Sequence, residues 1–292
     1  MPTSPTAPGP LGSRRGLVLA ITGTGAGSGA TTLAGSLALA MAARGLDLGL
    51  IDAGRSALRR TWLGPQGCAL VPHLMPLADL AAAPSWLAEL ADRTAGCDTT
   101  IVDLPAGDVT AFAAAALVAH VLVVTVKPDD VATARTARLL TRLGAATVER
   151  AVCGGSAGPT VLVVPARVDR RCHESGRWRG LYAGFGPKLE RAGVTGGIGP
   201  ALREDATLAA ALAARRWVGE IRSAGPACAD VMVLEATANE MLRRAAASPI
   251  LDVLRRRAPA KPAPVVTLHP RVAVRPPSPE PSAWWQRLLA AR

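Results

Sequence analysis

The sequence predicts an α/β protein in which helices flank a doubly wound, mostly parallel β-sheet. Two observations predict this fold class. Short runs rich in β-branched residues alternate along the chain with longer Ala- and Leu-rich runs, and each short run is almost continuously apolar. Strands that helices cover on both faces of a parallel sheet have this apolar character. A chain of 292 residues with 49% hydrophobic residues is long enough for one such domain with appended tails.

The alternation assigns the elements in chain order. A strand at 17–22, a helix at 31–44 and a strand at 46–52 come first. The same order then repeats as strand 99–103, helix 109–118, strand 120–126, helix 130–143 and strand 160–165. Beyond residue 169 the pattern weakens, and we expect helices at 205–215 and 228–246 and Gly-rich turns around Gly184, Gly186, Gly196 and Gly199.

The chain divides into four parts. Residues 1–15 contain too few apolar side chains to pack and are expected to form a disordered lead, and the folded domain spans 16–250. The prolines of 251–282 exclude a helix or a central strand, so we interpret this part as a linker. The terminal segment 283–292 places its tryptophans and leucines on one helical face, which is typical either of a membrane-surface helix or of a short peptide that docks on another protein.

The charge and the cysteines limit the partners and the compartment. The net charge is +11 and is carried mostly by arginine, the side chain that pairs best with phosphate. This charge predicts an acidic partner such as nucleic acid, or it reflects a GC-rich genome that encodes arginine in place of lysine. The five cysteines are scattered without a CxxC pair, which argues against a disulfide framework and a zinc site and favours the cytoplasm.

A Gly-rich segment lies between the first expected strand and the first expected helix. This is the context that a phosphate-binding loop requires, because glycines let backbone N–H groups converge on phosphate oxygens. The expected phosphate-binding residues are Gly25, Ala26, Gly27, Ser28, Gly29, Ala30, Thr31 and Thr32. The hydroxyl of Thr31, in the first helical turn, is a candidate Mg²⁺ ligand. The alternative interpretation is a Gly-rich turn that binds nothing.

Two carboxylates end buried strands at the same expected edge of the sheet. Asp103 follows the strand at 99–103, where it would hold Mg²⁺ directly or through water, and Asp52 ends the strand at 46–52. The candidate metal site therefore contains Thr31, Asp52 and Asp103, and Asp52 is also a candidate catalytic residue. Alternatively, each aspartate caps a turn or a helix.

These segments together resemble the ParA/MinD family of partition and positioning ATPases, which have a deviant Walker A motif. The resemblance covers about residues 16–247. Its motifs are Thr31-Thr32-Leu33-Ala34, Leu50-Ile51-Asp52-Ala53, Ile101-Val102-Asp103-Leu104-Pro105-Ala106-Gly107 and Val163-Val164-Pro165-Ala166-Arg167-Val168-Asp169. The resemblance implies a P-loop NTPase fold, ATP and Mg²⁺ as cofactors, and a homodimer or a heterodimer with a paralogue. It also implies non-specific DNA binding and a ParB-like or other regulatory partner.

The chain departs from the family motif at three charged positions. Ala30 stands where the family has the Walker lysine, Gly25 where it has its signature lysine, and Gly54 where it has a second aspartate. No shifted alignment restores a lysine, because the first lysine of the chain is Lys127, far past the loop, and Arg55 is the candidate spare cation. Loss of two preorganised cations predicts hydrolysis slower by at least ~10³-fold.

The leading hypothesis is a ParA-like protein for plasmid or chromosome segregation that binds nucleotide weakly and does not hydrolyse it. It would bind DNA in the cytoplasm, or at the nucleoid, through the late arginines Arg215, Arg216, Arg243, Arg244, Arg255, Arg256 and Arg257. The alternative to DNA binding is that these are ordinary solvated helix faces. Three competing hypotheses for the whole protein are an active Mg-ATPase with a substitute arginine, a MinD-like membrane-associated positioning protein and a cellulose-synthesis accessory protein.

Overall fold

The computed structural model describes residues 16–53, 90–91, 94, 97–152, 158–214, 216–221 and 225–245. Seven strands form one sheet in which β2, β3, β1, β4, β5 and β6 lie in that order and β7 also pairs with β5. Every pairing is parallel. The strands are β1 (Leu17–Gly23), β2 (Leu48–Asp52), β3 (Thr99–Asp103), β4 (Val121–Val126), β5 (Thr160–Val168), β6 (Gly196–Ile198) and β7 (Leu202–Arg203).

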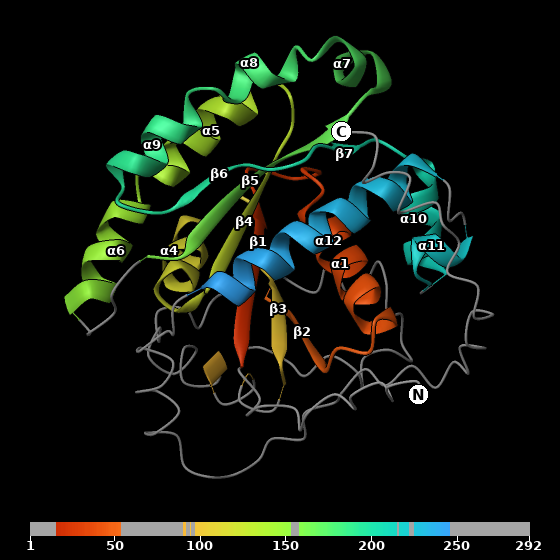
Figure 1. Ribbon diagram of the computed structural model, residues 1–292. Helices are drawn as coiled ribbons and strands as arrows, with labels where there is room; N and C mark the ends of the chain where they lie inside the picture. The colour runs from red at the N-terminus through yellow and green to blue at the C-terminus, as the bar shows by residue number, and fades with distance from the viewer. Residues whose placement is uncertain are drawn as a thin grey trace, which may run out of the picture.

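Helices cover both faces of the sheet (Figure 1). One face carries α1 (Ala30–Ala43), α10 (Ala206–Ala213), α11 (Val218–Ile221) and α12 (Pro226–Arg244). The other carries α4 (Val109–Val118), α5 (Asp130–Leu140), α6 (Leu143–Val152), α8 (Trp178–Tyr182) and α9 (Phe185–Arg191), and α7 (Arg170–Ser175) follows β5. Within β1 alternate side chains enter the two cores, because Leu19 and Ile21 join one buried cluster and Val18 and Ala20 the other. The predicted doubly wound parallel sheet is therefore confirmed.

The expected boundaries are accurate where an apolar run is continuous. The strand expected at 99–103 and the helix expected at 109–118 coincide with β3 and α4. The single helix expected at 130–143 is wrong, because α5 ends at Leu140 and α6 begins at Leu143. At the break, Thr141 Oγ1 donates to Arg138 O at 2.6 Å, a local side-chain bond that competes with a continuous helix.

Two of the expected Gly-rich turns are regular structure instead. Gly186 lies inside α9, which the burial of Phe185 and Leu189 holds against the sheet. Gly196 begins β6, where a Cβ atom would lie 2.2 Å from Val161 O, so that only glycine allows the two backbones to approach this closely. The expected lead 1–15, the linker and the terminal segment lie outside the described residues. No helix in the described part of the chain is long and apolar enough to cross a membrane.

Candidate functional site

The Gly-rich loop lies at the centre of the sheet, where the strand order reverses. It leaves the carboxyl end of β1, which pairs with β3 on one side and β4 on the other, and it enters α1 (Figure 1). In open α/β sheets, ligands bind in the crevice at the carboxyl ends of the strands at such a reversal. The topology therefore places the sequence-predicted loop at the crevice where such sheets bind their ligands.

The shape of the loop depends on glycine at three positions. A Cβ atom on Gly23 would lie 1.7 Å from Ser28 Oγ, because the loop folds back on the end of its strand. Gly27 and Gly29 have φ values of +69° and +88°, in the left-handed region that favours glycine. Thr125 of β4 fixes this shape, since its hydroxyl donates to Thr22 O at 3.2 Å and lies 3.3 Å from Ser28 Oγ.

The loop presents the start of α1 to its crevice. The first helical bond from this end joins Leu33 N to Gly29 O at 2.8 Å. In the described part of the chain, the amides of Ala30, Thr31 and Thr32 donate to no acceptor. The first turn of the helix carries no acidic residue that would repel an anion. Unpaired amides and the positive end of the helix dipole suit a phosphate group.

Two of the three candidate metal ligands are in direct contact. Thr31 Oγ1 donates to Asp103 Oδ2 at 2.9 Å, and Asp103 is fully buried. Asp103 Oδ1 has no hydrogen-bond partner among the described residues. Asp52 pairs with Asp103 across the register of β2 and β3, so that the three residues share one edge of the sheet. Carboxylate and hydroxyl oxygens with a spare lone pair fit Mg²⁺.

Burial controls the ionisation of Asp103. Desolvation raises its pKa to about 8, against the opposing hydrogen bond from Thr31, and the nearby charge of Asp52 raises it further. In the absence of a cation the carboxyl group is therefore largely protonated at neutral pH. A bound divalent cation would favour the ionised form instead.

The structure corrects the interpretation of Lys127 as remote from the loop. Thr125 pairs with Gly23 at the end of the parallel ladder of β4 and β1, and Lys127 follows two residues later, beside the loop. Its Nζ donates to Ala26 O at 3.5 Å. Distance along the sequence hid this contact, because the strand order that brings the end of β4 to the loop was not predicted. Gly54 and Arg55, the missing second aspartate and the suggested spare cation, lie outside the described residues.

Two arginines also approach the loop. Arg167, at the end of β5, has a left-handed φ of +57°, and its Nη1 donates to Gly27 O at 3.4 Å. Its Nε donates to Glu204 Oε1 at 3.1 Å, so this guanidinium is already paired with a carboxylate. Arg135 of α5 places Nη1 3.0 Å from the position that a Cβ atom on Gly25 would occupy.

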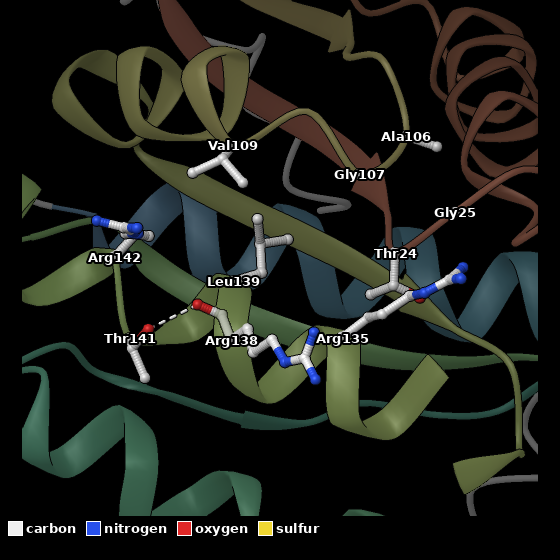
Figure 2. Close-up of a pocket in the computed structure, with 10 residues that line it drawn as sticks. All are labelled: Thr24, Gly25, Ala106, Gly107, Val109, Arg135, Arg138, Leu139, Thr141 and Arg142. Atoms are coloured by element: carbon white, nitrogen blue, oxygen red, sulfur yellow. Dashed lines mark hydrogen bonds between the residues drawn. The ribbon is translucent and has the colours of Figure 1, made fainter. Parts of the chain in front are cut away.

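A cavity of about 730 Å³ opens between the start of the loop and α5 (Figure 2). Thr24 and Gly25 line one side, together with the turn at Ala106 and Gly107 that follows Asp103. Gly107 N donates to Gly23 O at 2.7 Å, which holds this turn against the loop. The opposite wall contains Arg135, Arg138 and Arg142, whose spacing places them on one face of the α5 region. These arginines were not predicted, although their spacing is visible in the sequence.

The structure does not bring the candidate DNA-binding arginines together. Arg216 precedes α11, and Arg243 and Arg244 end α12, whose 19 residues span about 28 Å. Each of the three is paired with a glutamate. Arg216 contacts Glu220 at 3.3 Å, and Arg243 and Arg244 contact Glu240 at 2.7 and 2.6 Å. Arg215 and residues 255–257 lie outside the described residues.

Comparisons with known proteins identify the fold. No protein-family model and no curated protein sequence matches the chain. Among solved structures, the MinD cell division protein of Aquifex aeolicus matches with a TM-score of 0.54 and 18% identity over 77% of this chain and 97% of that one. The Cyanothece McdA(D38A)–ATP complex matches with a TM-score of 0.55 and 17% identity over 80% and 98%.

A third solved structure has a different activity in its name. Cobyrinic acid a,c-diamide synthase from Mycobacterium smegmatis, with bound ADP and magnesium, matches with a TM-score of 0.54 and 14% identity over 78% of this chain and 96% of that one. The chain therefore has the α/β fold of the MinD and McdA structures. At these identities the comparisons establish the fold alone.

Proposed function

We propose that the chain is a ParA-like positioning protein, for plasmid or chromosome segregation, that binds Mg²⁺ and ATP at the loop Gly23–Thr32. The observation that carries the proposal is the hydrogen bond between Thr31 and the buried Asp103, directly beside the unpaired amides of α1. A Gly-rich loop, a hydroxyl and a strand-end carboxylate in this arrangement suit a metal-bound polyphosphate. The names of two fold neighbours, a cell division protein and an ATP complex of McdA, support the positioning role and the nucleotide.

Each residue has a defined part in this proposal. The amides of residues 25–32 hold the phosphates, and Thr31 and Asp103 hold the cation, with Asp52 beside them. Mg²⁺, when bound, would neutralise charge on the phosphate oxygens. Asp52 is also the candidate group for orienting an attacking water. Asp103 must release its proton when the cation binds, because burial keeps the free carboxyl group protonated near neutral pH.

We expect hydrolysis to be slow. The segment 23–32 contains no charged side chain, and Ala30 and Gly25 replace the two lysines of the resembled motif. Without preorganised cations at these positions the rate should fall by at least ~10³-fold. A protein that binds but does not turn over nucleotide would remain in one state or pair with a competent paralogue.

The proposal extends to non-specific DNA as the partner. The net charge of +11 favours phosphate contacts that do not depend on sequence. The ion pairs of Arg216, Arg243 and Arg244 with glutamates weaken this contribution from the described residues. A homodimer or a heterodimer with a paralogue, a ParB-like or other regulatory partner, and a cytoplasmic or nucleoid-associated location complete the proposal.

The deciding experiment measures equilibrium binding of a fluorescent ATP analogue with Mg²⁺ to the wild type and to Asp103→Ala, together with turnover in the presence of DNA. We expect binding by the wild type, loss of that binding in the variant and no turnover. Absence of binding by the wild type would contradict the proposal. The chain would then retain the fold of a nucleotide-binding protein without the binding.

A second candidate function is an active Mg-ATPase in which other cations replace the missing lysines. The positions of Lys127, Arg135 and Arg167 around the loop favour it. Measurable turnover by the wild type would select this function over the hydrolysis-deficient one. Membrane association depends on residues 283–292, which lie outside the described residues, and liposome flotation with and without this segment tests it.

A further inference from the structure

The phosphate loop contains no charge of its own. Residues 23–32 are glycine, alanine, serine and threonine, so any cation that neutralises a bound polyphosphate must come from another element. The described part of the chain brings three cations to this loop: Lys127, Arg135 and Arg167. Two of them have no carboxylate partner among the described residues.

We infer that Lys127 and Arg135 supply the charge for nucleotide binding that the loop itself lacks, with Lys127 binding the phosphates held in the loop and Arg135 binding the terminal phosphate of a nucleoside triphosphate. This inference rests on the proposed nucleotide binding and adds to it the residues that supply charge and distinguish a triphosphate from a diphosphate.

Lys127 is held beside the middle of the loop. Its Nζ lies 3.5 Å from Ala26 O and 3.4 Å from the position that a Cβ atom on Gly27 would occupy. The backbone just before it is fixed, because Val126 is the last residue of β4 and its carbonyl accepts a 3.0 Å hydrogen bond from the buried Tyr182 hydroxyl. The backbone beside Lys127 is therefore held, while its ammonium group makes only a weak carbonyl contact. Such a group is available to an anion in the loop.

Arg135 approaches the other end of the loop, next to the cavity. Its Nη1 lies 3.0 Å from the position of a Cβ atom on Gly25, so the guanidinium occupies the space into which a side chain at residue 25 would project. Figure 2 shows this side chain extending from α5 towards Thr24 and Gly25. The cavity wall that Thr24 and Gly25 line also contains Gly107, which lies four residues after Asp103 of the proposed metal site. A phosphate that extends out of the loop past Asp103 would enter this space.

Lys127 and Arg135 differ from Arg167 in their ion pairs with the described residues. No carboxylate in the described part pairs with Lys127 or Arg135. Arg167 is bound to Glu204 and donates to Gly27 O, so it shapes the loop and contributes little net charge. Guanidinium and ammonium groups without a carboxylate partner are the ones that a phosphate group can pair with at full strength.

The test measures the dissociation constants of Mg-ATP and Mg-ADP for the wild type, Lys127→Met and Arg135→Met. Lys188→Met and Arg191→Met on α9 are the matched controls, because they remove the same charges far from the loop. We expect Lys127→Met to weaken both nucleotides by about 10- to 100-fold, the usual size of a charge-assisted hydrogen bond. Arg135→Met should weaken Mg-ATP by about 10-fold and leave Mg-ADP within about twofold of the wild type.

The outcomes separate this inference from the function on which it rests. If the wild type binds neither nucleotide, the proposed function fails. If the wild type binds both and the two variants behave like the α9 controls, only the assignment of the two cations fails. Equal loss of ATP and ADP affinity in Arg135→Met would overturn the assignment of Arg135 to the terminal phosphate. Lys127→Arg keeps the charge, and recovery of affinity in this variant excludes a loss caused by misfolding.

Discussion

Asp103, which the proposed function assigns to the metal site, is a buried side chain with a cost in stability. One carboxyl oxygen accepts a hydrogen bond from the hydroxyl of Thr31, and the other has no hydrogen-bond partner in the described part of the chain. An ionised carboxylate in this setting is poorly solvated unless a cation is present. Residues that hold metal ions commonly weaken the metal-free fold in this way, because the interaction that stabilises them is supplied by the ligand.

The first prediction concerns the pH dependence of stability without Mg²⁺. The pKa of Asp103 is about 8 in the folded protein against 3.8 for an ordinary aspartate, so the folded state binds the proton more tightly. Stability should therefore fall as the pH rises between these two values. Asp103→Asn removes this dependence, and its stability relative to the wild type should improve by about 2–4 kcal/mol from pH 5 to pH 8.

Urea denaturation of both proteins at several pH values, with EDTA present, gives the two stability curves. Parallel curves from pH 5 to pH 8 would contradict the raised pKa. Addition of Mg²⁺ and nucleotide should reverse the comparison, because only the wild type retains the carboxylate.

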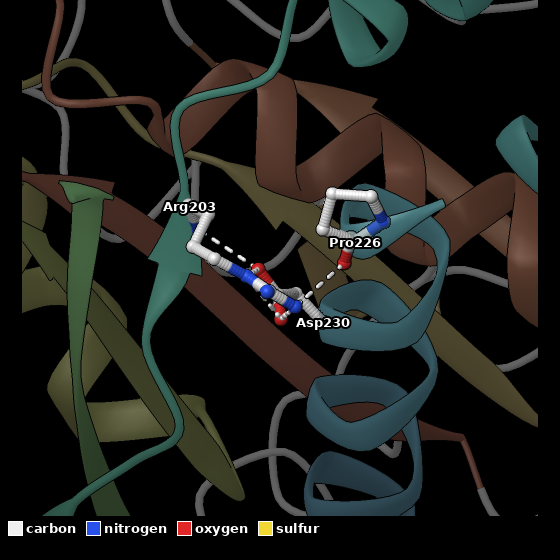
Figure 3. A network of polar contacts seen from close by, with 3 residues as sticks. All are labelled: Arg203, Pro226 and Asp230. Carbon is white, nitrogen blue, oxygen red and sulfur yellow. Dashed lines mark hydrogen bonds and ion pairs between the residues drawn. The ribbon is translucent and has the colours of Figure 1, made fainter. Parts of the chain in front are cut away.

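At the scale of elements, β7 depends on one ion pair with α12. Arg203 Nη2 and Nε donate to the two carboxyl oxygens of Asp230 at 2.6 and 2.9 Å, and the backbone N of Arg203 also donates to Asp230 (Figure 3). Arg203 Nη2 further donates to Pro226 O at 3.2 Å, at the start of α12. A strand of two residues has little pairing of its own, so this bidentate contact fixes its position.

The second prediction is that Asp230→Ala destabilises the protein by about 1–3 kcal/mol, because it leaves a half-buried guanidinium and a strand amide without their acceptor. The matched control is Glu220→Ala, which breaks the exposed pair with Arg216 and should change stability very little. Chemical denaturation gives the two values. Faster amide exchange at Arg203 in the first variant alone would locate the effect in β7, and equal effects of the two substitutions would refute the assignment.

The elements show what sequence patterns can and cannot predict. The strand β3 and the helix α4 were predicted to the residue because the β-branched run of the first and the Ala-rich run of the second differ clearly in composition, with Pro105, Gly107 and Asp108 between them. The short helices α7 to α9 and the strands β6 and β7 were missed, because their few residues are ordered by distant contacts. Tyr182, for example, packs between Trp178 and Phe185 and bonds to the end of β4. Such contacts have no periodic signature in the sequence.

Part of the candidate site could likewise be predicted from the sequence, and part could not. The loop, Thr31, Asp52 and Asp103 were predicted because they are adjacent to strands in the sequence, and their roles stay predictions. Lys127 and Arg135 were not found, because they reach the loop through strand order and helix placement. Local motifs therefore gave the candidate site, whereas the cations around it could be found only from the fold.

At the scale of the whole molecule, the positive charge is less available than the net value of +11 suggests. Glu240 contacts both Arg243 and Arg244 at the end of α12. These pairs are largely exposed and are therefore weak and sensitive to salt. A polyanion would compete with Glu240 for the two arginines.

The third prediction follows for DNA binding. Glu240→Gln should strengthen binding to non-specific duplex DNA by a few-fold, and Arg243→Ala with Arg244→Ala should weaken it and reduce the salt slope by about 1–2. Fluorescence anisotropy over a series of salt concentrations measures both effects. Glu174→Gln, which releases an arginine on α7, is the control for charge alone. An equal gain in both glutamine variants would mean that DNA does not use the end of α12.

The register between β4 and β1 also has a consequence for evolution. Because Lys127 follows β4 directly beside the loop that leaves β1, a cation at the exit of one strand can stand in for a cation in the loop after its neighbour, without any change in the fold. The two positions are then open to exchange over evolutionary time, and a chain that regained lysine at residue 30 would no longer constrain residue 127. A search for contiguous motifs would count the absence of the loop lysine as a loss of function and would overlook the cation on the neighbouring strand. The electric field at a bound phosphate depends on where the cations lie in space and does not depend on their order in the chain.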